Sequence, residues 1–528
     1  MLTDDAAYEA ILARDPRFDG VFFVGVQTTG VYCRPICPAR TPGRSRCTFY
    51  ATPAQAEQAG FRACFRCRPE VAPAAASTPA SVDAIDSLVT AATQRISEGA
   101  LNSGSIDDLA AELGVTARHL RRATEARLGV SPVELAQTRR LALAKQLLQD
   151  TTLPITSIAF AAGFGSVRRF NAMFAAKMGT PPTEIRRKHA ASAGDAIELR
   201  LDYRPPYDWD RLLGFLRGRA IPGVEKITDE YRRVVHLDGH VGEIVVRPDL
   251  RGAVRSTRAD GGTQTPPRTA LVLELAPTLL PVVMPLVARV RRMFDLDARP
   301  DLVDRALARD KALAPMIAKR PGVRLPGAID PFEASIRALL GQQVSVAAAT
   351  TLAGRFAAQL GTKIGKSGDA GGAEIGKSGD RPTRSTAAGG AEIDEQELAY
   401  RFPTPAEVAK AGAERIVKIG MPMARANAIH GFARALSRGE IQLDHHVDLD
   451  AFVARLVELP GIGPWTAHYL AMRALHLPDA FPASDLGIQK ALARSGPREA
   501  EARAEAWRPY RSYAVIHLWT ELSEGATS

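Results

Sequence analysis

The chain has 528 residues, too many for one hydrophobic core, so it predicts several domains. Its formal net charge of +10 favours a polyanionic partner, either nucleic acid or an acidic membrane surface. The start, MLTDDAAYEA, is acidic where a secretory signal is basic and then apolar, and no run of about 18 apolar residues follows. We therefore expect a soluble cytoplasmic protein and exclude a secreted or membrane-spanning one.

All the cysteines lie in one N-terminal segment, predicted as a domain over residues 1–75. Two chelating pairs, Cys33-x3-Cys37 and Cys64-x2-Cys67, are separated by a loop, which suits one tetrahedral Zn²⁺ held by four thiolates. Cys47 lies between the pairs and is interpreted as a small buried residue, because four ligands already saturate Zn²⁺. From spacing alone, a purely structural zinc site is the favoured interpretation.

The residues around the cysteines change that interpretation. TGVYCRPICPART at 29–41 and FYATPAQAEQAGFRACFRCRPEV at 49–71 resemble the small α+β N-terminal domain of Ada-type alkylation sensors. The resemblance implies that Cys33 is both a zinc ligand and the stoichiometric acceptor of a methyl group from DNA methylphosphotriesters. Methylation would remove one negative charge near the phosphates and raise DNA affinity. Candidate phosphate contacts and their supports are Arg34, Arg40, Arg66, Thr29 and Tyr32; for any single arginine, solvated surface is the alternative.

Residues 76–84 are rich in Ala, Pro and Ser, which predicts a linker. Helical periodicity then covers 85–190 and contains two copies of helix, glycine turn and helix, at 105–130 and 155–180. One copy could be an ordinary helical hairpin, but the tandem pair resembles the all-α AraC-type DNA-binding domain. The resemblance implies helices starting near Thr116 and Ser166 in successive major grooves, with promoter DNA and RNA polymerase as partners. Candidate DNA contacts are Arg118, Arg121, Arg122, Arg168, Arg169 and Asn171.

Residues 195–276 alternate in hydrophobicity, as in RRVVHL at 232–237 and GEIVVRP at 242–248, which predicts an α+β domain. Helical periodicity returns over 277–528 and is broken by a Gly-, Ser- and Lys-rich insertion at 361–398. We interpret the insertion as a disordered loop, since it offers little apolar area to offset ordering entropy. Its GKS triplets lack the spacing and the preceding strand of a phosphate-binding loop.

The segment LPGIGPWTA at 459–467 combines a Gly-x-Gly hairpin with the start of a helix, and Asp485 follows in FPASDLGIQKAL at 481–492. Gly461 and Gly463 would let the backbone approach a DNA phosphate, although a tight interhelical turn is the alternative. Together the hairpin and the aspartate resemble the helix-hairpin-helix glycosylase superfamily. Further segments, including RLPGAIDPFEASIRALLGQQVSV at 324–346 and WRPYRSYAVIHLW at 507–519, fall in the order of an AlkA-type 3-methyladenine DNA glycosylase.

This resemblance implies that Asp485 stabilises the oxocarbenium charge that develops when a glycosidic bond breaks, and orients water. The target base must be flipped out of the duplex. Candidate pocket walls are Trp465, Tyr469, Tyr510 and Phe215, and core packing is the favoured alternative for Phe215.

Several positions depart from relatives within that superfamily. Trp465 stands where bifunctional relatives carry a Schiff-base lysine, so we expect no strand cleavage. The absence of cysteine after Cys67 excludes an iron–sulfur cluster. Gln343 replaces the apolar wedge that fills the vacated stack, and Tyr510 replaces a tryptophan.

We thus expect a mainly α multidomain protein that joins an alkylation sensor, a transcription activator and a repair glycosylase, acting on double-stranded, alkylated and promoter DNA. The main alternative is a zinc-containing AraC-type regulator whose C-terminal half binds DNA without catalysis. Asp485 argues against it, because a pure binding module needs no buried carboxylate beside DNA. A membrane-surface protein fits the charge but not the helix-turn-helix pair.

Overall fold

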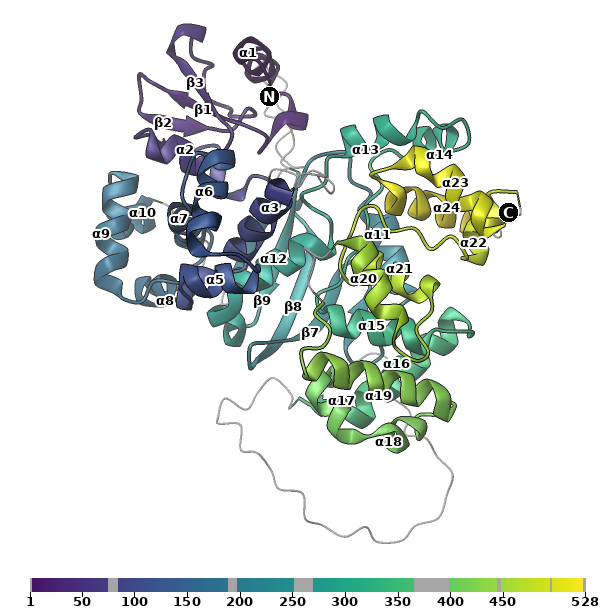
Figure 1. Ribbon diagram of the computed structural model, residues 1–528. Helices are drawn as coiled ribbons and strands as arrows, with labels where there is room; N and C mark the ends of the chain where they lie inside the picture. Colours follow the sequence, from purple (N-terminus) through teal and green to yellow (C-terminus); the bar gives the residue numbers. More distant parts are fainter. Residues whose placement is uncertain are drawn as a thin grey trace, which may run out of the picture.

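The computed structural model describes residues 2–74, 84–188, 197–250, 269–364, 398–443, 448–493 and 496–525 (Figure 1). The predicted linker at 76–84 and the predicted insertion at 361–398 lie outside these residues, except at their ends. Among the described helices, none combines the length and the apolar character that a membrane crossing requires.

The N-terminal part is a four-stranded sheet in the order β3-β1-β2-β4, with short helices packed on it. Strand β2 runs antiparallel to β1 and parallel to β4. The parallel register pairs Tyr32 with Ala63, so the residues that follow, Cys33 and Cys64, lie at the same end of the sheet. The elements are α1 Asp4–Ala13, β1 Phe23–Val26, β2 Val31–Cys33, β3 Cys47–Tyr50, α2 Pro53–Gln58 and β4 Arg62–Ala63, with 3-10 turns at Pro16–Phe18, Arg44–Arg46 and Pro69–Val71.

The next part is helical and contains both predicted helix-turn-helix units. Gly114 (φ +69°) and Gly163 (φ +82°) form the two turns in a backbone region that favours glycine. Thr116 and Ser166 then cap the second helix of each unit with their side-chain oxygens. The helices are α3 Ala84–Ser97, α4 Ala100–Ser103, α5 Ile106–Glu112, α6 Ala117–Leu128, α7 Pro132–Asp150, α8 Ile155–Ala161, α9 Val167–Met178 and α10 Pro182–Lys188.

The third part is a five-stranded antiparallel sheet in the order β5-β9-β8-β7-β6. The alternating stretches at 232–237 and 242–248 form β7 and β8, as predicted. Its first strand in the chain, β5, is an edge strand within this sheet. The elements are β5 Ile197–Asp202, α11 Trp209–Arg217, β6 Glu225–Ile227, β7 Tyr231–Leu237, β8 His240–Pro248 and β9 Ala270–Leu275.

The C-terminal part is helical, apart from a two-residue strand pair at the ends of the predicted insertion. The glycine hairpin joins α20 to α21, and Asp485 begins α22. The elements are η5 Pro277–Val282, α12 Val283–Met293, α13 Pro300–Leu307, α14 Ala314–Lys319, α15 Pro331–Leu340, α16 Val346–Leu360, β10 Thr362–Lys363, β11 Tyr400–Arg401, α17 Pro405–Ala411, α18 Ala413–Val417, α19 Met423–Ser437, α20 Leu449–Val457, α21 Pro464–Arg473, α22 Leu486–Ala491, α23 Pro497–Ala504, η6 Glu505–Trp507 and α24 Arg511–Gly525.

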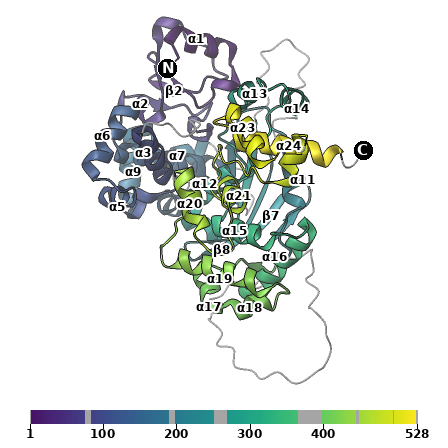
Figure 2. The ribbon, with the colours of Figure 1, turned by 45° about the vertical axis from the view of Figure 1, so that its right-hand side comes forward.

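The first three parts share one hydrophobic core. Phe23 and Tyr32 of the N-terminal sheet, Leu141 and Leu147 of α7, and Leu199 of β5 belong to a single cluster of buried side chains. Helix α7 packs against both α2 and β5; Figure 1 shows it below the N-terminal sheet, and in Figure 2 it overlaps the strands of the five-stranded sheet. The predicted fold class is confirmed. The predicted domains pack against one another through this shared cluster of buried side chains.

A buried ion network joins the five-stranded sheet to the C-terminal helices. Arg233 of β7 pairs with Glu225 of β6 (3.5 Å) and with Glu333 of α15 (2.5 Å), and Arg337 of α15 pairs with both acids. Buried charges are stable only when they are paired, so the network fixes α15 against the sheet.

Candidate metal centre and candidate glycosylase site

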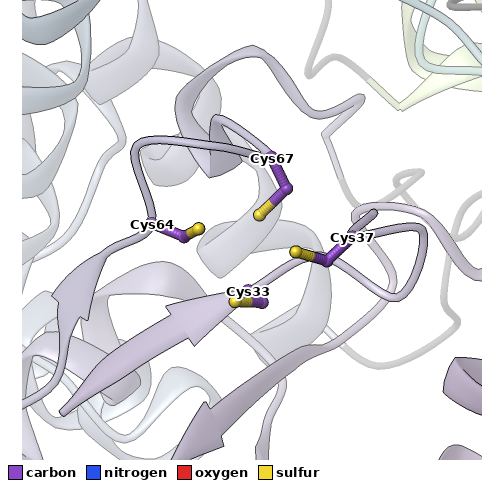
Figure 3. Close-up of side chains that lie close together, drawn as sticks. All are labelled: Cys33, Cys37, Cys64 and Cys67. Atoms are coloured by element: carbon purple, nitrogen blue, oxygen red, sulfur yellow. The ribbon is translucent and has the colours of Figure 1, made fainter. Parts of the chain in front are cut away.

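Four cysteine sulfurs converge at the end of the N-terminal sheet. Cys33, Cys37, Cys64 and Cys67 place their Sγ atoms within 4.8 Å of one another, and Figure 3 shows the sulfurs turned toward a common centre. A Zn–S bond of about 2.3 Å would separate tetrahedral sulfurs by ~3.8 Å, so the arrangement fits one Zn²⁺. Cys47 lies on β3 outside this group, as predicted.

The surroundings of the sulfurs favour thiolates bound to a cation. Four thiolates with their sulfurs this close repel one another, so a cation between them is needed to keep all four deprotonated. The backbone N–H groups of Arg34 and Arg66 donate to the sulfurs of Cys67 and Cys64, each at 3.4 Å. These donors stabilise negative charge on sulfur without adding a ligand.

The structure corrects the prediction that Arg34 contacts DNA phosphates. Arg34 is only 4% exposed, and its guanidinium pairs with Asp19 and with Asp202 of β5. Burial alone would lower the pKa of Arg34, but the two carboxylates raise it well above its usual value. A guanidinium held in this way is not available to the DNA backbone.

Tyr32, predicted as a support for phosphate binding, also points inward. It is 3% exposed, and its hydroxyl donates to Glu57 Oε1 at 3.0 Å. Thr138 of α7 donates to the other oxygen of Glu57 at 2.7 Å. Tyr32 therefore joins the candidate zinc domain to the helix-turn-helix region.

The other arginines predicted to contact DNA are exposed. Arg40 and Arg66 are exposed near the cysteines, and the remaining side chains lie on the exposed surface of α6 and α9. Exposure suits contact with DNA, and these assignments stay predictions. The helical residues are Arg118, Arg121, Arg122, Arg168, Arg169 and Asn171.

The glycine hairpin requires its small residues. Gly461 has φ +84°, and a Cβ there would lie 2.6 Å from Cβ of Ala428 in α19. Gly463 is the N-cap of α21 and is exposed. Gln342 donates to the carbonyl of Gly461 at 3.0 Å and to Oγ1 of Thr466 at 3.1 Å, which ties the loop before α16 to the hairpin.

Gln343 follows in that loop and is exposed with φ +58°, a conformation that residues other than glycine rarely adopt. Val344 and Val346, on either side of Ser345, are 37% and 49% exposed. The loop thus presents Gln343 together with apolar side chains beside the hairpin. Its contact with DNA stays a prediction.

The Asp485 carboxylate is held by neutral donors. Oδ1 accepts from the backbone N–H of Ile488 at 3.0 Å and from Nε1 of Trp519 at 2.9 Å. Oδ2 accepts from Nε1 of Trp465 at 3.0 Å. No ion pair to Asp485 occurs among the residues that the structure describes, so its negative charge is oriented but not neutralised.

Gly487 leaves the space that this arrangement needs. A Cβ at this position would lie 2.9 Å from Oδ1 of Asp485 and 3.2 Å from Cδ1 of Trp519. Glycine within a helix costs roughly 0.5–1 kcal/mol relative to alanine. Glycine is nevertheless required here, because the carboxylate of Asp485 and the indole of Trp519 fill the space that a side chain at position 487 would need.

Two of the predicted pocket residues lie beside the carboxylate. Trp465 and Tyr469, one turn apart on α21, stack with ring centroids 5.2 Å apart, and Tyr469 lies 6.2 Å from Trp519. Burial would raise the pKa of Tyr469, but Arg473 and Arg219 lower it overall. These rings form a partly buried aromatic surface next to Asp485.

The other two predicted pocket residues lie differently. Phe215 of α11 is half-buried, with the guanidiniums of Arg219 and Arg473 at 3.9 and 4.9 Å from its ring centre, so it adjoins the aromatic surface through Arg473. Tyr510 instead packs edge-on against Tyr513.

The residue that sequence reasoning missed is Trp519. It ends the segment 507–519 that resembles the AlkA-type glycosylases, so the sequence carries a signal for it. Tyr510 is predicted to replace a tryptophan of that family, and the tryptophan that reaches the carboxylate lies further along the same segment, on α24.

Four family models match the chain. They are the metal binding domain of Ada at residues 6–70, a helix-turn-helix domain at 109–188, the AlkA N-terminal domain at 198–330, and the HhH-GPD superfamily base excision DNA repair protein at 336–510. Together they follow the order expected from the sequence.

The most extensive similarity among three curated relatives is to "Probable bifunctional transcriptional activator/DNA repair enzyme AlkA" of Mycobacterium tuberculosis (strain CDC 1551 / Oshkosh), at 37% identity over 98% of this chain and 96% of that protein. "DNA-3-methyladenine glycosylase 2" of Escherichia coli (strain K12) is 32% identical over 60% of this chain and 95% of its own length. "Bifunctional transcriptional activator/DNA repair enzyme Ada" of the same organism is 36% identical over 30% of this chain and 42% of its own.

Proposed function

The chain belongs to the family of bifunctional transcriptional activator/DNA repair enzymes of the AlkA type, and on this premise we propose that its two halves carry out two reactions on alkylated DNA. The C-terminal half removes alkylated bases of the 3-methyladenine type by hydrolysing the glycosidic bond. The N-terminal half accepts a methyl group from a methylphosphotriester on Cys33 and then activates transcription.

The observation that carries the glycosylase proposal is the unneutralised Asp485 carboxylate between two indole donors. When the glycosidic bond breaks, its electron pair leaves with the base and the sugar becomes positively charged. The carboxylate stabilises that charge. Water then bonds to the anomeric carbon and gives a proton to Asp485. An alkylated purine is already cationic, so it leaves without strong acid catalysis.

The aromatic surface next to Asp485 suits a flipped base. Trp465 and Tyr469 offer stacked rings to an electron-poor, cationic purine. Trp465 also stands where a lyase needs an amine nucleophile. We therefore propose a monofunctional glycosylase that leaves an abasic site without cutting the strand.

Methyl transfer at Cys33 follows from the four-sulfur site. Zn²⁺ bound there would keep the sulfurs deprotonated at neutral pH while leaving them electron-rich. The Cys33 sulfur attacks the methyl carbon, the C–O bond breaks, and the electron pair stays on the phosphate oxygen as a normal diester. The thioether product has no route back, so transfer is stoichiometric.

The helix-turn-helix pair connects this chemistry to transcription. Loss of one negative charge at Cys33 strengthens binding to DNA phosphates, because repulsion decreases. The exposed arginines of α6 and α9 would then hold promoter DNA in two successive major grooves. RNA polymerase is the expected protein partner of the activated form.

Both reactions can be tested with the intact chain. Methylated duplex DNA should release free 3-methyladenine and keep unbroken strands until alkali is added, as measured by chromatography and gel electrophoresis. DNA carrying a methylphosphotriester should add one methyl group to the peptide that contains Cys33, as measured by mass spectrometry. Absence of base release favours the alternative of a regulator that only binds DNA.

Removing one indole donor should slow base release selectively. Trp519→Phe keeps an aromatic ring but loses the hydrogen bond to Oδ1 of Asp485. A hydrogen bond to a charged group contributes about 1.5–3 kcal/mol, so we expect a single-turnover rate roughly ten- to a hundredfold lower. Trp465→Phe should behave similarly, because it removes the donor to Oδ2.

Trp209→Phe is the matched control for these two variants. It makes the same change in a partly buried tryptophan whose Nε1 donates to the carbonyl oxygen of Asp229 at 3.3 Å, away from Asp485. Its rate should stay within about twofold of wild type. A larger loss for Trp209→Phe than for Trp519→Phe would contradict the assignment of Trp519 to the site.

A further inference from the structure

The residue after the candidate methyl acceptor reaches across a domain boundary. Arg34 Nη1 donates to Oδ2 of Asp202 at 2.7 Å, and its Nε donates to Oδ1 of Asp19 at 2.7 Å. Asp202 is the last residue of β5, in the part of the chain that resembles the AlkA N-terminal domain. The side chains of Arg34 and Asp202 are 4% and 8% exposed, so solvent screens this pair poorly.

The pair belongs to a row of alternating charges. Asp19 pairs with Arg34, Arg34 with Asp202, Asp202 with Arg200 at 2.8 Å, and Arg200 with Asp249. The row begins beside the cysteines and ends within the five-stranded sheet. Asp202 pairs with both Arg34 and Arg200. Removing its charge would therefore leave each of these buried arginines with one acidic partner fewer.

Arg34 in turn holds the Cys67 segment. Its backbone N–H donates to Sγ of Cys67 at 3.4 Å, and its Nη1 donates to the carbonyl oxygen of Cys67 at 3.2 Å. One residue thus touches a zinc-ligand sulfur, the backbone of that ligand, and an acid of the other half of the protein. A shift of the Arg34 backbone would move this N–H donor away from the sulfur of Cys67.

The interface around this contact is tight. Arg204, just after β5, donates to the carbonyl oxygens of Asp19 at 2.9 Å and of Ala74 at 2.6 Å. A Cβ on Gly20 would lie 1.9 Å from the carbonyl oxygen of Pro73, so the two backbone segments are in close contact with no room for a side chain. The geometry around Arg34 is therefore set by both halves together.

We propose that Asp202, a residue of the glycosylase half, is a positioning residue for the zinc centre, and that it acts through Arg34. This inference deepens the proposed methyl-acceptor function and rests on it only for the rate of methyl transfer. Without the Asp202 charge, Arg34 shifts toward Asp19, the N–H donor to Cys67 weakens, and the four sulfurs hold the metal less firmly. The five-stranded sheet of the glycosylase half then helps to set the positions of the four cysteine sulfurs in the sensor.

The test measures zinc release to a chromogenic chelator from the purified zinc-loaded chain. Asp202→Asn should release zinc at least about tenfold faster than wild type, because a buried ion pair loses one partner. Glu198→Gln is the matched control: it lies on the same strand and pairs with Arg247 inside the sheet, and it should release zinc like wild type. Base release should be unchanged in both variants, which shows that the glycosylase half is folded.

A double-mutant cycle with Arg34→Gln decides whether Asp202 acts through Arg34. In the Arg34→Gln background, Asp202→Asn should add little further zinc loss, since neighbours that act together are not additive. If Asp202→Asn does not fold, Arg34→Lys is the second variant. Its ammonium cannot bridge two carboxylates as a guanidinium does, so this variant should also release zinc faster than wild type. Wild-type zinc release in Asp202→Asn or in Arg34→Lys, or additive losses in the double variant, overturns the proposal.

Zinc release does not depend on methyl transfer, so the methyl-acceptor function of Cys33 and the positioning role of Asp202 can be refuted independently. If wild-type protein takes no methyl group, the methyl-acceptor function is wrong while the zinc-release cycle still tests the positioning role. If both hold, methyl transfer by Asp202→Asn should be slower at equal zinc occupancy, and Glu198→Gln should match wild type.

Discussion

Asp485→Asn is expected to abolish release of 3-methyladenine while leaving the protein folded. The substitution keeps the size of the side chain and an oxygen for the N-terminus of α22, and asparagine caps helices as well as aspartate does. It removes the negative charge that opposes the developing sugar cation. We expect the single-turnover rate to fall on the order of a thousandfold or more, measured by chromatography of bases released from methylated duplex DNA.

The chain offers a matched control for this variant. Asp448 caps α20 through a hydrogen bond from the N–H of Ala451 at 2.9 Å, in the same helical part of the protein. Asp448→Asn should keep the wild-type rate, and both variants should show nearly the wild-type midpoint of thermal unfolding. Turnover by Asp485→Asn at the Asp448→Asn rate would refute the catalytic role of the carboxylate.

Replacing Cys33 with histidine is expected to abolish methyl acceptance without emptying the metal site. Imidazole is a good zinc ligand, and sites with three cysteines and one histidine are common. It lacks the thiolate that attacks the methyl carbon. Zinc content by atomic spectroscopy should stay near one per chain, while mass spectrometry after exposure to methylphosphotriester DNA should find no added methyl group.

Cys37→His is the comparison that separates ligand from acceptor. It makes the same change at another sulfur of the same group, with Cys33 intact. It should hold zinc and still gain one methyl group. Methylation of Cys33→His at another cysteine, to the wild-type extent, would show that the acceptor was assigned to the wrong sulfur. Base release should be normal in both variants.

Local spacing predicts the cysteine set, and the resemblance to helix-hairpin-helix glycosylases implies Asp485 as the candidate catalytic residue. Cys33, Cys37, Cys64 and Cys67 occur in two closely spaced pairs, and the parallel register of β2 with β4 then brings the pairs together. Asp485 and Trp465 lie in neighbouring motifs of the sequence, and Nε1 of Trp465 donates to Oδ2 of Asp485. The fold class followed for the same reason, because periodicity and turn residues are local properties.

Long-range partners could not be predicted in this way. Arg34 looks like a surface arginine in the sequence, since nothing near it shows that Asp202 will lie 2.7 Å away. Trp519 likewise reaches Asp485 only because α24 packs beside α22. Whether a charged or aromatic side chain is buried depends on which distant elements meet, and that is a property of the whole fold.

The common core of α7, β5 and the N-terminal sheet has a practical consequence for anyone who divides the gene. Ending a fragment near residue 190 would separate α7 from β5, and with them Leu147 and Leu199, which belong to one cluster and are fully buried in the intact chain. Exposing such a side chain costs roughly 1.5–3 kcal/mol, and the uncovered faces would be prone to aggregation. A soluble fragment of this protein therefore calls for redesign of that face rather than a new stop codon.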